Sequence, residues 1–473
     1  MSLISSFDRR SAAALPLALA AALVGCDGST VAPEALAQET ETQLDRDAED
    51  WFQPEADPQT LKRALGDDAV SERWIYHDLD AARRDARRTG KPILALFRCV
   101  PCGSAPTLDG ALCTVGGAEA SQFEREITAA GGELDALLDQ FTVVRMVKMN
   151  GVNRHVFAFD RDVPHAAVFL NADGTVYGRY GTRISKDRKE LVRHKLSSFQ
   201  QSLKRVLELH EDAPRNEAEL AGKRPAPAGP ALAEELPAFE PFPAKHNPPL
   251  VSNCIHCHTV GEAELRQTIL DGDLALRDLW PFPRAENLGM TIAVDHGLKL
   301  ESVAPRSAAA AAGLKPGDLL LELNGQPLVS EADVQWVLHH APDEASLPME
   351  VRRDGETVRT TIRLAGDWRK SDGNWRASLR PARPNMRLVP DPQKRRKGIA
   401  PDETGLTVNW PTGKAAEAGL KNKDLLVAVD GRTDLLLEAD FLKYIHFDRP
   451  DADSVQLTVL RRGRRMTVTL PVR

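Results

Sequence analysis

A segment of 13 residues occurs twice in the C-terminal half of the chain. Residues 313–325 read Gly-Leu-Lys-Pro-Gly-Asp-Leu-Leu-Leu-Glu-Leu-Asn-Gly, and residues 419–431 read Gly-Leu-Lys-Asn-Lys-Asp-Leu-Leu-Val-Ala-Val-Asp-Gly. An alanine-rich stretch precedes each copy, and a pair of arginines beside a turn follows each. A repeated sequence is expected to fold into a repeated unit. We therefore predict two related units, each with a short helix, a turn, a strand and a terminal hairpin.

Each unit resembles a bacterial PDZ domain, through Ser-Val-Ala-Pro-Arg-Ser-Ala at 302–308, the repeated segment itself and Leu-Gly-Met at 288–290. In that family the Leu-Gly-hydrophobic loop points backbone N–H groups at a peptide C-terminal carboxylate, and the following strand pairs with the peptide. The resemblance implies peptide-binding residues, which are Leu288, Gly289, Met290 and Ile292 in the first unit and Thr404, Gly405, Leu406 and Val408 in the second. The alternative is that one or both units only pack against the rest of the chain.

PDZ domains often accompany trypsin-like serine proteases, whose chemistry needs a serine nucleophile with His and Asp partners. The chain contains no Gly-x-Ser-Gly-Gly-like nucleophile segment, and no His and Asp partners for such a serine are recognisable. The sequence therefore disfavours protease activity.

The N-terminus resembles a bacterial lipoprotein signal. Arg9 and Arg10 precede an apolar stretch at 12–24, which is too short to span a membrane as a mature helix. Leu-Val-Gly-Cys at 23–26 resembles a lipobox, in which Cys26 would carry the lipid. We expect an exported protein, lipid-anchored at the periplasmic face of a bacterial membrane, where disulfides form. A plain secretory signal is the alternative.

Six cysteines are present, and five remain once Cys26 is set aside. Cys99 and Cys102 form a CxxC pair directly after the apolar run 92–97. At a helix N-terminus the thiolate of the first cysteine would be stabilised. A static disulfide, or half of a zinc site completed by Cys113, are the alternatives.

The segment from Trp74 to Tyr180 resembles the thioredoxin-like superfamily. Apolar runs predict strands at 93–97, 141–147, 166–170 and 176–180, with a helix at 79–88 and a closing helix at 191–209. The resemblance implies that Cys99 attacks, Cys102 resolves, and Pro164, held in cis, shapes the substrate groove. The whole arrangement is similar to a bacterial thioredoxin-like/PDZ (seleno)protein family, in which Cys99 would stand where other members carry selenocysteine.

A second motif, CxxCH, places Cys254, Cys257 and His258 together. This pattern is typical of covalent haem c attachment, with both thiols bonded to the porphyrin and His258 as axial ligand of the haem iron. A disulfide is one alternative. A metal site that uses the two cysteines, His256 or His258, and His246 is another.

Shifts in composition divide the chain into seven segments. We predict a lipoprotein signal peptide (1–26), an acidic tether (27–70), a thioredoxin-like domain (71–212), a proline-rich linker with the CxxCH segment (213–285), a first PDZ-like domain (286–366), a linker (367–385) and a second PDZ-like domain (386–473). The fold class is multidomain α/β plus α+β, with a thioredoxin-like sheet domain followed by two PDZ-like β-barrel domains. The net charge of -7 indicates no attraction to nucleic acid.

These features together predict a membrane-tethered periplasmic thiol–disulfide oxidoreductase. Its PDZ units would recruit peptide or protein C-termini, and its clients would be thiols or disulfides. Two alternatives remain open at this point. One is an electron-transfer protein in which haem c is coupled to the dithiol, and the other is a PDZ scaffold with a degenerate thioredoxin-like domain.

Overall fold

The computed structural model describes residues 50–54, 57–98, 117–182, 195–226, 228–240, 254–371, 373, 375–379, 386–409, 411 and 413–472. The chain divides into two compact units, residues 1–50 and 51–473, and everything below concerns the second. Five residues with predicted roles lie outside the described residues: Cys26, Cys99, Cys102, Cys113 and His246. No helix among the described residues has the length and apolar character needed to cross a bilayer.

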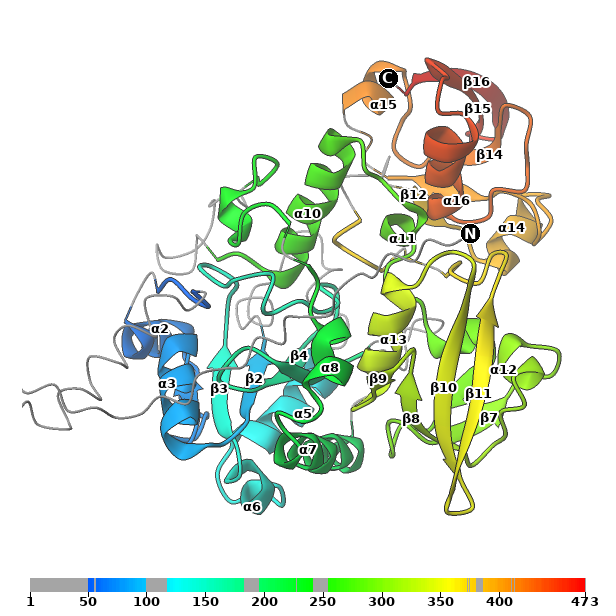
Figure 1. The fold of residues 1–473 in the computed structure, drawn as a ribbon. Coiled ribbons are helices and arrows are strands. Elements are labelled where there is room, and N and C mark those ends of the chain that lie inside the picture. The colour runs from blue at the N-terminus through cyan, green and yellow to red at the C-terminus, as the bar shows by residue number, and fades with distance from the viewer. Residues whose placement is uncertain are drawn as a thin grey trace, which may run out of the picture. The chain divides into compact units, whose positions relative to one another are not determined.

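A five-stranded mixed sheet organises the first part of this unit (Figure 1). In spatial order its strands are β1 (Ile75–Tyr76), β3 (Thr142–Met146), β2 (Ile93–Phe97), β4 (Ala166–Leu170) and β5 (Val176–Tyr180). The first three strands run parallel, and β4 and β5 pair antiparallel to their neighbours. Every residue of β2 is buried because both faces of the sheet are covered, which explains its uninterrupted apolar sequence.

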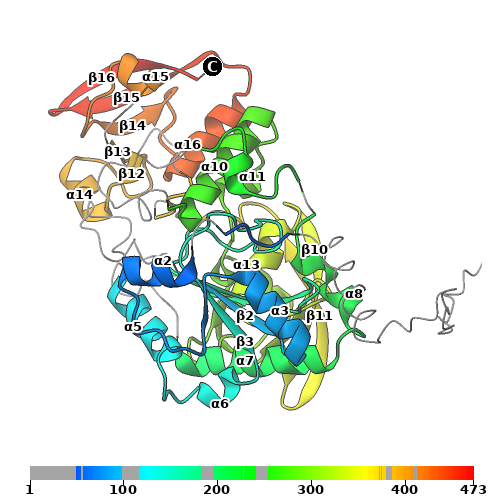
Figure 2. The same ribbon diagram turned by 90° about the vertical axis from the view of Figure 1, so that its left-hand side faces the viewer.

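Helices cover both faces of this sheet. They are α2 (Pro58–Leu65), α3 (Leu79–Thr89), α5 (Gly117–Thr128), α6 (Asp135–Leu138) and α7 (Leu196–Glu211). Ile93, Ala95 and Phe97 face the cluster that contains the buried residues of α3, whereas Leu94 and Leu96 face the cluster of α7. This split follows from the two-residue period of a strand. Figure 2 shows α3 in front of the strands.

The described parts of the predicted tether (27–70) and of the predicted linker (213–285) include buried residues. The predicted tether 27–70 includes Trp51 and Phe52, which are 1% and 4% exposed in the sheet core. The proline-rich stretch after α7 buries Lys223 and forms short helices. These helices are α8 (Glu217–Leu220), η1 (Ala221–Lys223) and η2 (Ala233–Glu235), and they are followed by α10 (Cys257–Asp271) and α11 (Leu276–Leu279). Frequent prolines thus did not prevent docking, because leucines and alanines between them bury apolar surface.

The first repeated unit combines a two-stranded and a four-stranded sheet. Its elements are η3 (Ala285–Leu288), β6 (Met290–Ile292), β7 (Leu300–Val303), α12 (Ala308–Ala311), β8 (Leu319–Leu323), β9 (Gln326–Pro327), α13 (Glu331–His340), β10 (Ala345–Arg353) and β11 (Glu356–Leu364). Strands β6 and β7 pair with each other, and the second sheet has the order β11-β10-β8-β9.

The second unit has a similar order of elements, except that α14 is inserted between its first two strands and no strand corresponds to β9, and it forms one continuous sheet, β12-β13-β14-β15-β16. Its elements are β12 (Met386–Leu388), α14 (Asp391–Arg396), β13 (Leu406–Val408), α15 (Gly413–Glu417), β14 (Leu425–Val429), α16 (Glu438–Lys443), the π-helix η5 (Tyr444–Asp448), β15 (Ser454–Arg461) and β16 (Arg464–Pro471). The prediction of two related units, each with a short helix, a strand and a terminal hairpin, is confirmed.

Candidate peptide-binding site

The loop before β6 depends on a glycine. Gly289 has φ +87°, a backbone conformation that residues with a side chain rarely adopt. A Cβ at this position would also lie 2.2 Å from Cβ of Ser307. The carbonyl of Gly289 accepts a hydrogen bond of 2.8 Å from the N–H of Ala304, which fixes the loop against the end of β7. The loop is therefore a rigid turn whose shape requires glycine.

One edge of β6 has no strand partner among the described residues. Within the described part of the chain, β6 pairs only with β7, and Met290 lies opposite Val303. The carbonyl of Gly289 and the N–H of Ala293 both bond toward the β7 side. Because backbone groups alternate along a strand, those of Met290 and Ile292 face the opposite edge. The structure thus brings the four predicted residues of the first unit onto one loop and strand, and peptide binding by them stays a prediction.

A positively charged residue at this loop, Arg284, was not predicted from the sequence. Arg284 is the N-cap residue of η3, and its side chain is 19% exposed. One guanidinium nitrogen lies 2.9 Å from a carboxylate oxygen of Glu286. A positive charge five residues before Gly289 would favour an anionic group at the loop. The short distance in sequence between Arg284 and the Leu-Gly-Met motif could have indicated that this residue lies near the loop.

Helix α13 packs against the core of the first unit on one side and against the sheet domain on another. Val334 and Leu338 are fully buried with Met290 and Ile292. On the other side, the side-chain amide of Gln335 donates a 2.8 Å hydrogen bond to the hydroxyl of Thr182, just after β5. The helix is therefore shared between the PDZ-like core and the sheet domain.

Buried charges make up the contact between α13 and the sheet domain. Asp333 lies 3.1 Å from the ammonium of Lys223 and 3.8 Å from the guanidinium of Arg179. Burial lowers the pKa of Lys223 to about 8, and burial likewise lowers the pKa of Arg179 to about 10. The Arg179 guanidinium also stacks 3.5 Å from the ring centroid of Trp336, whose indole N–H donates to the carbonyl of Gly222. A buried pair of this kind is costly to break, because either partner alone would be an uncompensated charge.

The predicted site of the second unit does not fit strand addition. Strand β13 pairs with β12 on one edge and with β14 on the other, so Leu406 and Val408 cannot accept a further strand. The Thr404 hydroxyl accepts a 3.1 Å hydrogen bond from the N–H of Leu435, and a Cβ at Gly405 would meet the Lys394 side chain at 2.7 Å. These residues are structural. The predicted site was assigned to the wrong strand of the second unit, because β13 is the counterpart of β7, not of β6.

Pro164 differs from its predicted role. Among the described residues, the cis peptide bond is the one before Pro214, so the bond before Pro164 is trans. The Pro164 carbonyl accepts a 3.0 Å hydrogen bond from Arg98, whose guanidinium also pairs with Glu124 at 3.0 Å. Cys99 and Cys102, the partners that Pro164 was predicted to face, lie outside the described residues.

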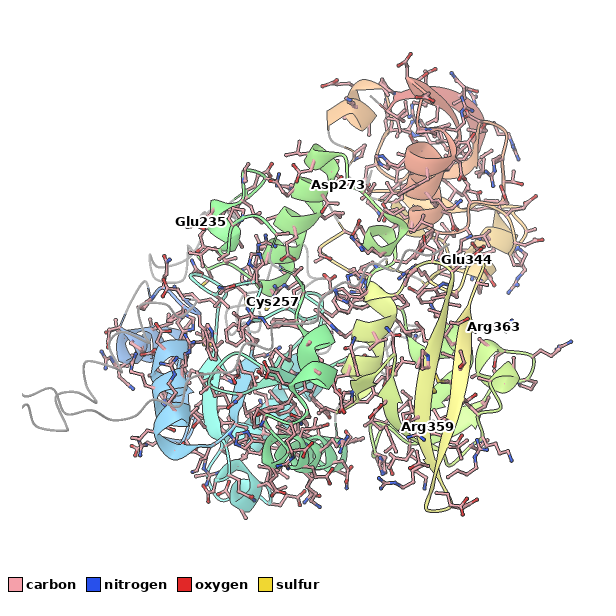
Figure 3. The ribbon with its side chains drawn as sticks, viewed as in Figure 1. Glu235, Cys257, Asp273, Glu344, Arg359 and Arg363 are labelled. Atoms are coloured by element: carbon pink, nitrogen blue, oxygen red, sulfur yellow. The ribbon has the colours of Figure 1, made fainter. Side chains whose placement is uncertain are left out.

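The CxxCH segment packs against the sheet domain. Cys254 and Ile255 are 5% and 6% exposed, and Ile255 is bonded through its N–H to the Asn150 side chain and through its carbonyl to the N–H of Met149, both at 2.8 Å. Cys257 begins α10, as Figure 3 shows, and Nδ1 of His258 lies 3.3 Å from Glu262.

This packing bears on each interpretation of the motif. Cys254 and Cys257 are not joined by a disulfide, and the described residues contain no group of three or more potential metal ligands. Covalent haem would need the sulfur of Cys254 at a porphyrin edge, which does not fit a side chain enclosed in the core. Haem attachment therefore stays a prediction that the geometry does not favour.

Comparisons with known proteins find a PDZ domain. Residues 300–353 match the PDZ domain family. A probable periplasmic serine endoprotease, DegP-like, from Marinomonas sp. is 26% identical over 190 residues, which cover 40% of this chain and 39% of that protein. Periplasmic serine endoprotease DegP from Escherichia coli is 33% identical over 75 residues, 16% of each chain. This chain thus spans well under two thirds of the length of the curated relatives it matches.

Two solved structures are also similar over short stretches. The serine endoprotease from Yersinia pestis is 26% identical, over 16% of this chain and 28% of that chain, with a TM-score of 0.15. The HtrA3 PDZ domain bound to a phage-derived ligand is 30% identical, over 14% of this chain and 62% of that chain, with a TM-score of 0.13.

These findings correct the predicted function and family. The relatives are named serine endoproteases, so the prediction of a thiol–disulfide oxidoreductase is wrong, and client thiols and haem-coupled electron transfer fall with it. The resemblance to a thioredoxin-like/PDZ (seleno)protein family is replaced by similarity to DegP-type proteins. The chain is a multidomain α/β protein with a PDZ domain.

Proposed function

We propose that this chain is an exported peptide-binding protein of periplasmic proteolysis, whose first PDZ unit binds the C-terminus of polypeptides. The observation that carries the proposal is the available edge of β6 directly after the rigid Gly289 turn, within a unit that matches the PDZ family. A bound peptide would extend the two-stranded sheet, and the N–H groups of the loop would hold its carboxylate. Arg284 would add a favourable charge.

The test uses the full chain and one short peptide in two forms. Isothermal titration would compare the pentapeptide Phe-Gly-Arg-Trp-Val, the phage-derived ligand of the HtrA3 PDZ domain, with its C-terminal amide. Because the amide lacks the negative charge, we expect it to bind at least about tenfold more weakly. Equal affinity for both forms, or no binding of any peptide from a library with free C-termini, would overturn the proposal.

A charge reversal locates the site. Arg284→Glu should weaken binding of the free-carboxylate peptide by about tenfold or more, because it places an anion beside the loop. Arg359→Glu is the matched control, since Arg359 lies on β11 with its side chain 80% exposed.

A second candidate is endopeptidase activity of the chain itself, which the names of the relatives favour. Labelling with a fluorophosphonate and mass spectrometry of the incubated peptide would decide this. Labelling of one serine together with cleavage would establish a protease, whereas binding without cleavage would leave capture of peptides as the function.

We also propose a thioredoxin-like topology for the sheet domain, without redox chemistry. The order β1-β3-β2-β4-β5, with three parallel strands followed by two antiparallel ones and helices on both faces, supports it. In this proposal the domain is a platform on which α13 is docked.

The periplasmic relatives support export of this chain, and we propose in addition that it is lipid-anchored through Cys26. The mass of the protein extracted from membranes tests this directly. Cys26→Ser should release the protein in soluble form, and a mature protein without lipid would contradict the anchor.

A further inference from the structure

The two units can be aligned residue by residue through their strand pairing. In the first unit Met290 of β6 lies opposite Val303 of β7. In the second, Met386 of β12 lies opposite Val408 of β13. Strand β12 is also the terminal strand of its sheet. Met386 is therefore the counterpart of Met290, and β12 is the strand along which the second unit would take a peptide.

The helices that flank these strands share a sequence as well. Both α13 and α16 begin with Glu-Ala-Asp, at 331–333 and 438–440. The two glutamates nevertheless differ in their surroundings. The hydroxyl of Ser330, directly before Glu331, donates a 2.6 Å hydrogen bond to the carbonyl of Arg179, so the start of α13 lies against the sheet domain. Glu438 instead points at β12.

The N–H of Met386 donates a hydrogen bond of 2.6 Å to the Oε1 atom of Glu438, whose side chain is only 2% exposed. The counterpart of this N–H in the first unit, that of Met290, faces the available edge of β6. A short hydrogen bond to an ionised carboxylate is among the stronger ones in proteins. The second unit thus already has a carboxylate on the N–H group where a peptide C-terminus would arrive.

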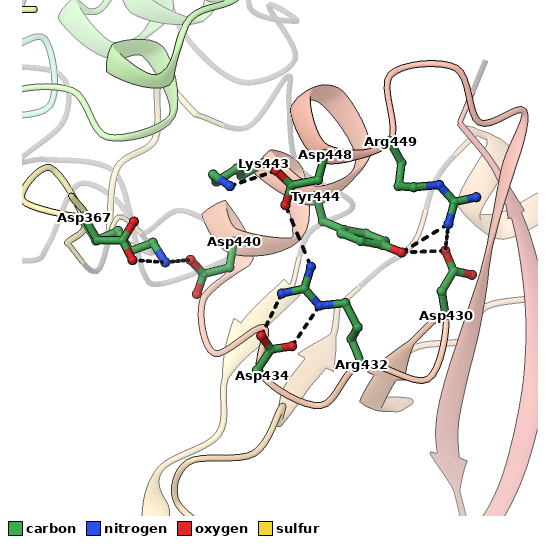
Figure 4. Close-up of polar contacts among 10 residues, drawn as sticks. Asp367, Asp430, Arg432, Asp434, Asp440, Lys443, Tyr444, Asp448 and Arg449 are labelled. Atoms are coloured by element: carbon green, nitrogen blue, oxygen red, sulfur yellow. Dashed lines mark hydrogen bonds and ion pairs between the residues drawn. The ribbon is translucent and has the colours of Figure 1, made fainter. Parts of the chain in front are cut away.

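A network of polar contacts surrounds α16, the helix that carries Glu438 (Figure 4). Asp440 accepts hydrogen bonds from the N–H groups of Leu436 and Leu437 at 3.2 and 3.0 Å and caps the helix. Lys370 bridges Asp367 and Asp440 at 3.0 and 3.3 Å. The start of α16, from which Glu438 projects, is therefore fixed by the two hydrogen bonds to Asp440 and by the ion pair between Asp440 and Lys370.

We propose that Glu438 is a built-in substitute for a peptide C-terminal carboxylate and closes the second unit to peptides. This inference rests on the proposed function in that it assumes C-terminal capture by PDZ units of this chain. Its consequence is one peptide per chain, bound by the first unit. Removing the Glu438 carboxylate should open a second site for a peptide with a free C-terminus.

The experiment counts peptide sites on the full chain. Phage libraries of random heptapeptides with free C-termini would be selected separately against the wild type, Glu438→Ala and Glu417→Ala, the last being an exposed glutamate of the same unit. Selected peptides would then be titrated calorimetrically. We expect one site on the wild type and on Glu417→Ala, and two on Glu438→Ala. In the Arg284→Glu background, Glu438→Ala should raise affinity for its selected peptide at least about tenfold.

Each outcome decides a different proposal. Two sites on the wild type, or no new site on a folded Glu438→Ala chain, would overturn the role of Glu438. No site on the wild type but one on Glu438→Ala would overturn peptide capture by the first unit and leave this inference standing. Glu438→Gln keeps the shape of the side chain and should open the site partly if alanine disturbs folding. Amide exchange at Met386 should speed up in both variants and slow down again with peptide.

Discussion

Arg353 forms a two-pronged ion pair with Asp318, with both N–O distances at 2.7 Å. Arg461 and Asp424 form the same pair in the second unit, at 2.8 and 2.6 Å. In each case the arginine also donates to the carbonyl of the glycine that opens the repeated segment, and the aspartate is 1% exposed. The pair ties the terminal hairpin of each unit to its central turn.

Loss of either aspartate charge should destabilise its unit. Burial raises the pKa of Asp318, but hydrogen bonds from Arg353 and from the N–H of Lys315 outweigh it and hold the pKa below 3.8. Asp318→Asn should lower the free energy of unfolding by about 1.5–3 kcal/mol, measured by urea denaturation. Asp354→Asn, in an exposed turn, is the control and should change it by less than about 0.5 kcal/mol.

The same pair gives a pH dependence with a definite sign. Because the folded-state pKa of Asp318 is lowered, its contribution to stability is complete above about pH 4 and is lost as the pH falls through the folded value. Wild type should therefore lose more stability on acidification than Asp318→Asn. Parallel acid-unfolding curves for the two proteins would contradict this account.

Lys223 should be indispensable to the contact between the sheet domain and α13. Lys223→Met leaves the buried Asp333 with the more distant Arg179 as its cation, so we expect a loss of about 3–5 kcal/mol in unfolding free energy. Lys204→Met, on the exposed side of α7, is the control. The lowered pKa of Lys223, about 8, adds a second signature. Between about pH 8 and 10.5 the unfolded chain binds more protons, so wild-type stability should rise with pH, and Lys223→Met should lack this rise.

The close approach of β5 to α13 depends on a missing side chain. A Cβ at Gly178 would lie 2.6 Å from the Asp333 carboxylate and from Cβ of Val329. Gly178→Ala should therefore cost about 1–3 kcal/mol through overpacking, seen as a lower melting temperature in calorimetry. Gly222→Ala is a matched control, because its Cβ would meet only the mobile end of the Gln326 side chain at 2.6 Å. Equal effects of the two substitutions would argue against a rigid contact.

The two cysteines of the CxxCH segment should behave differently. Cys254→Ser buries a hydroxyl in the core and should cost about 1–3 kcal/mol, whereas the partly exposed Cys257→Ser should cost less than about 0.5 kcal/mol. We expect no pyridine haemochrome spectrum from protein exported together with haem maturation enzymes. A haemochrome lost in Cys254→Ser would restore the haem interpretation.

Local sequence patterns predicted several strands and turns correctly. The apolar run at 93–97 forms β2, and the repeated segment forms β8 and β14 with the turns before them. Such patterns report burial and turn chemistry, which are encoded within a few residues. The Leu-Gly-Met motif likewise located the loop that the structure builds around Gly289.

The sequence could not predict which residues far apart along the chain contact each other. The second unit has no Leu-Gly-hydrophobic motif at β12, so Thr-Gly-Leu at 404–406 was mistaken for one, and only the register with Val408 identifies Met386 as the counterpart. The contact of Lys223 with Asp333 joins residues separated by 110 positions and leaves no periodic trace. Function was misassigned for a related reason: short cysteine motifs are compatible with several chemistries, and their surroundings decide among them.

Because α13 serves both the PDZ core and the sheet domain, the proposed peptide binding and domain docking would be thermodynamically reciprocal. The affinity for a peptide that contacts α13 would depend on how stably α13 is docked. A change that weakens the contacts of Arg179 and Lys223 would alter this affinity by the same factor by which peptide binding alters docking. Weakening the contact of α13 with the sheet domain would then change the affinity for a peptide, and a bound peptide would change the stability of that contact.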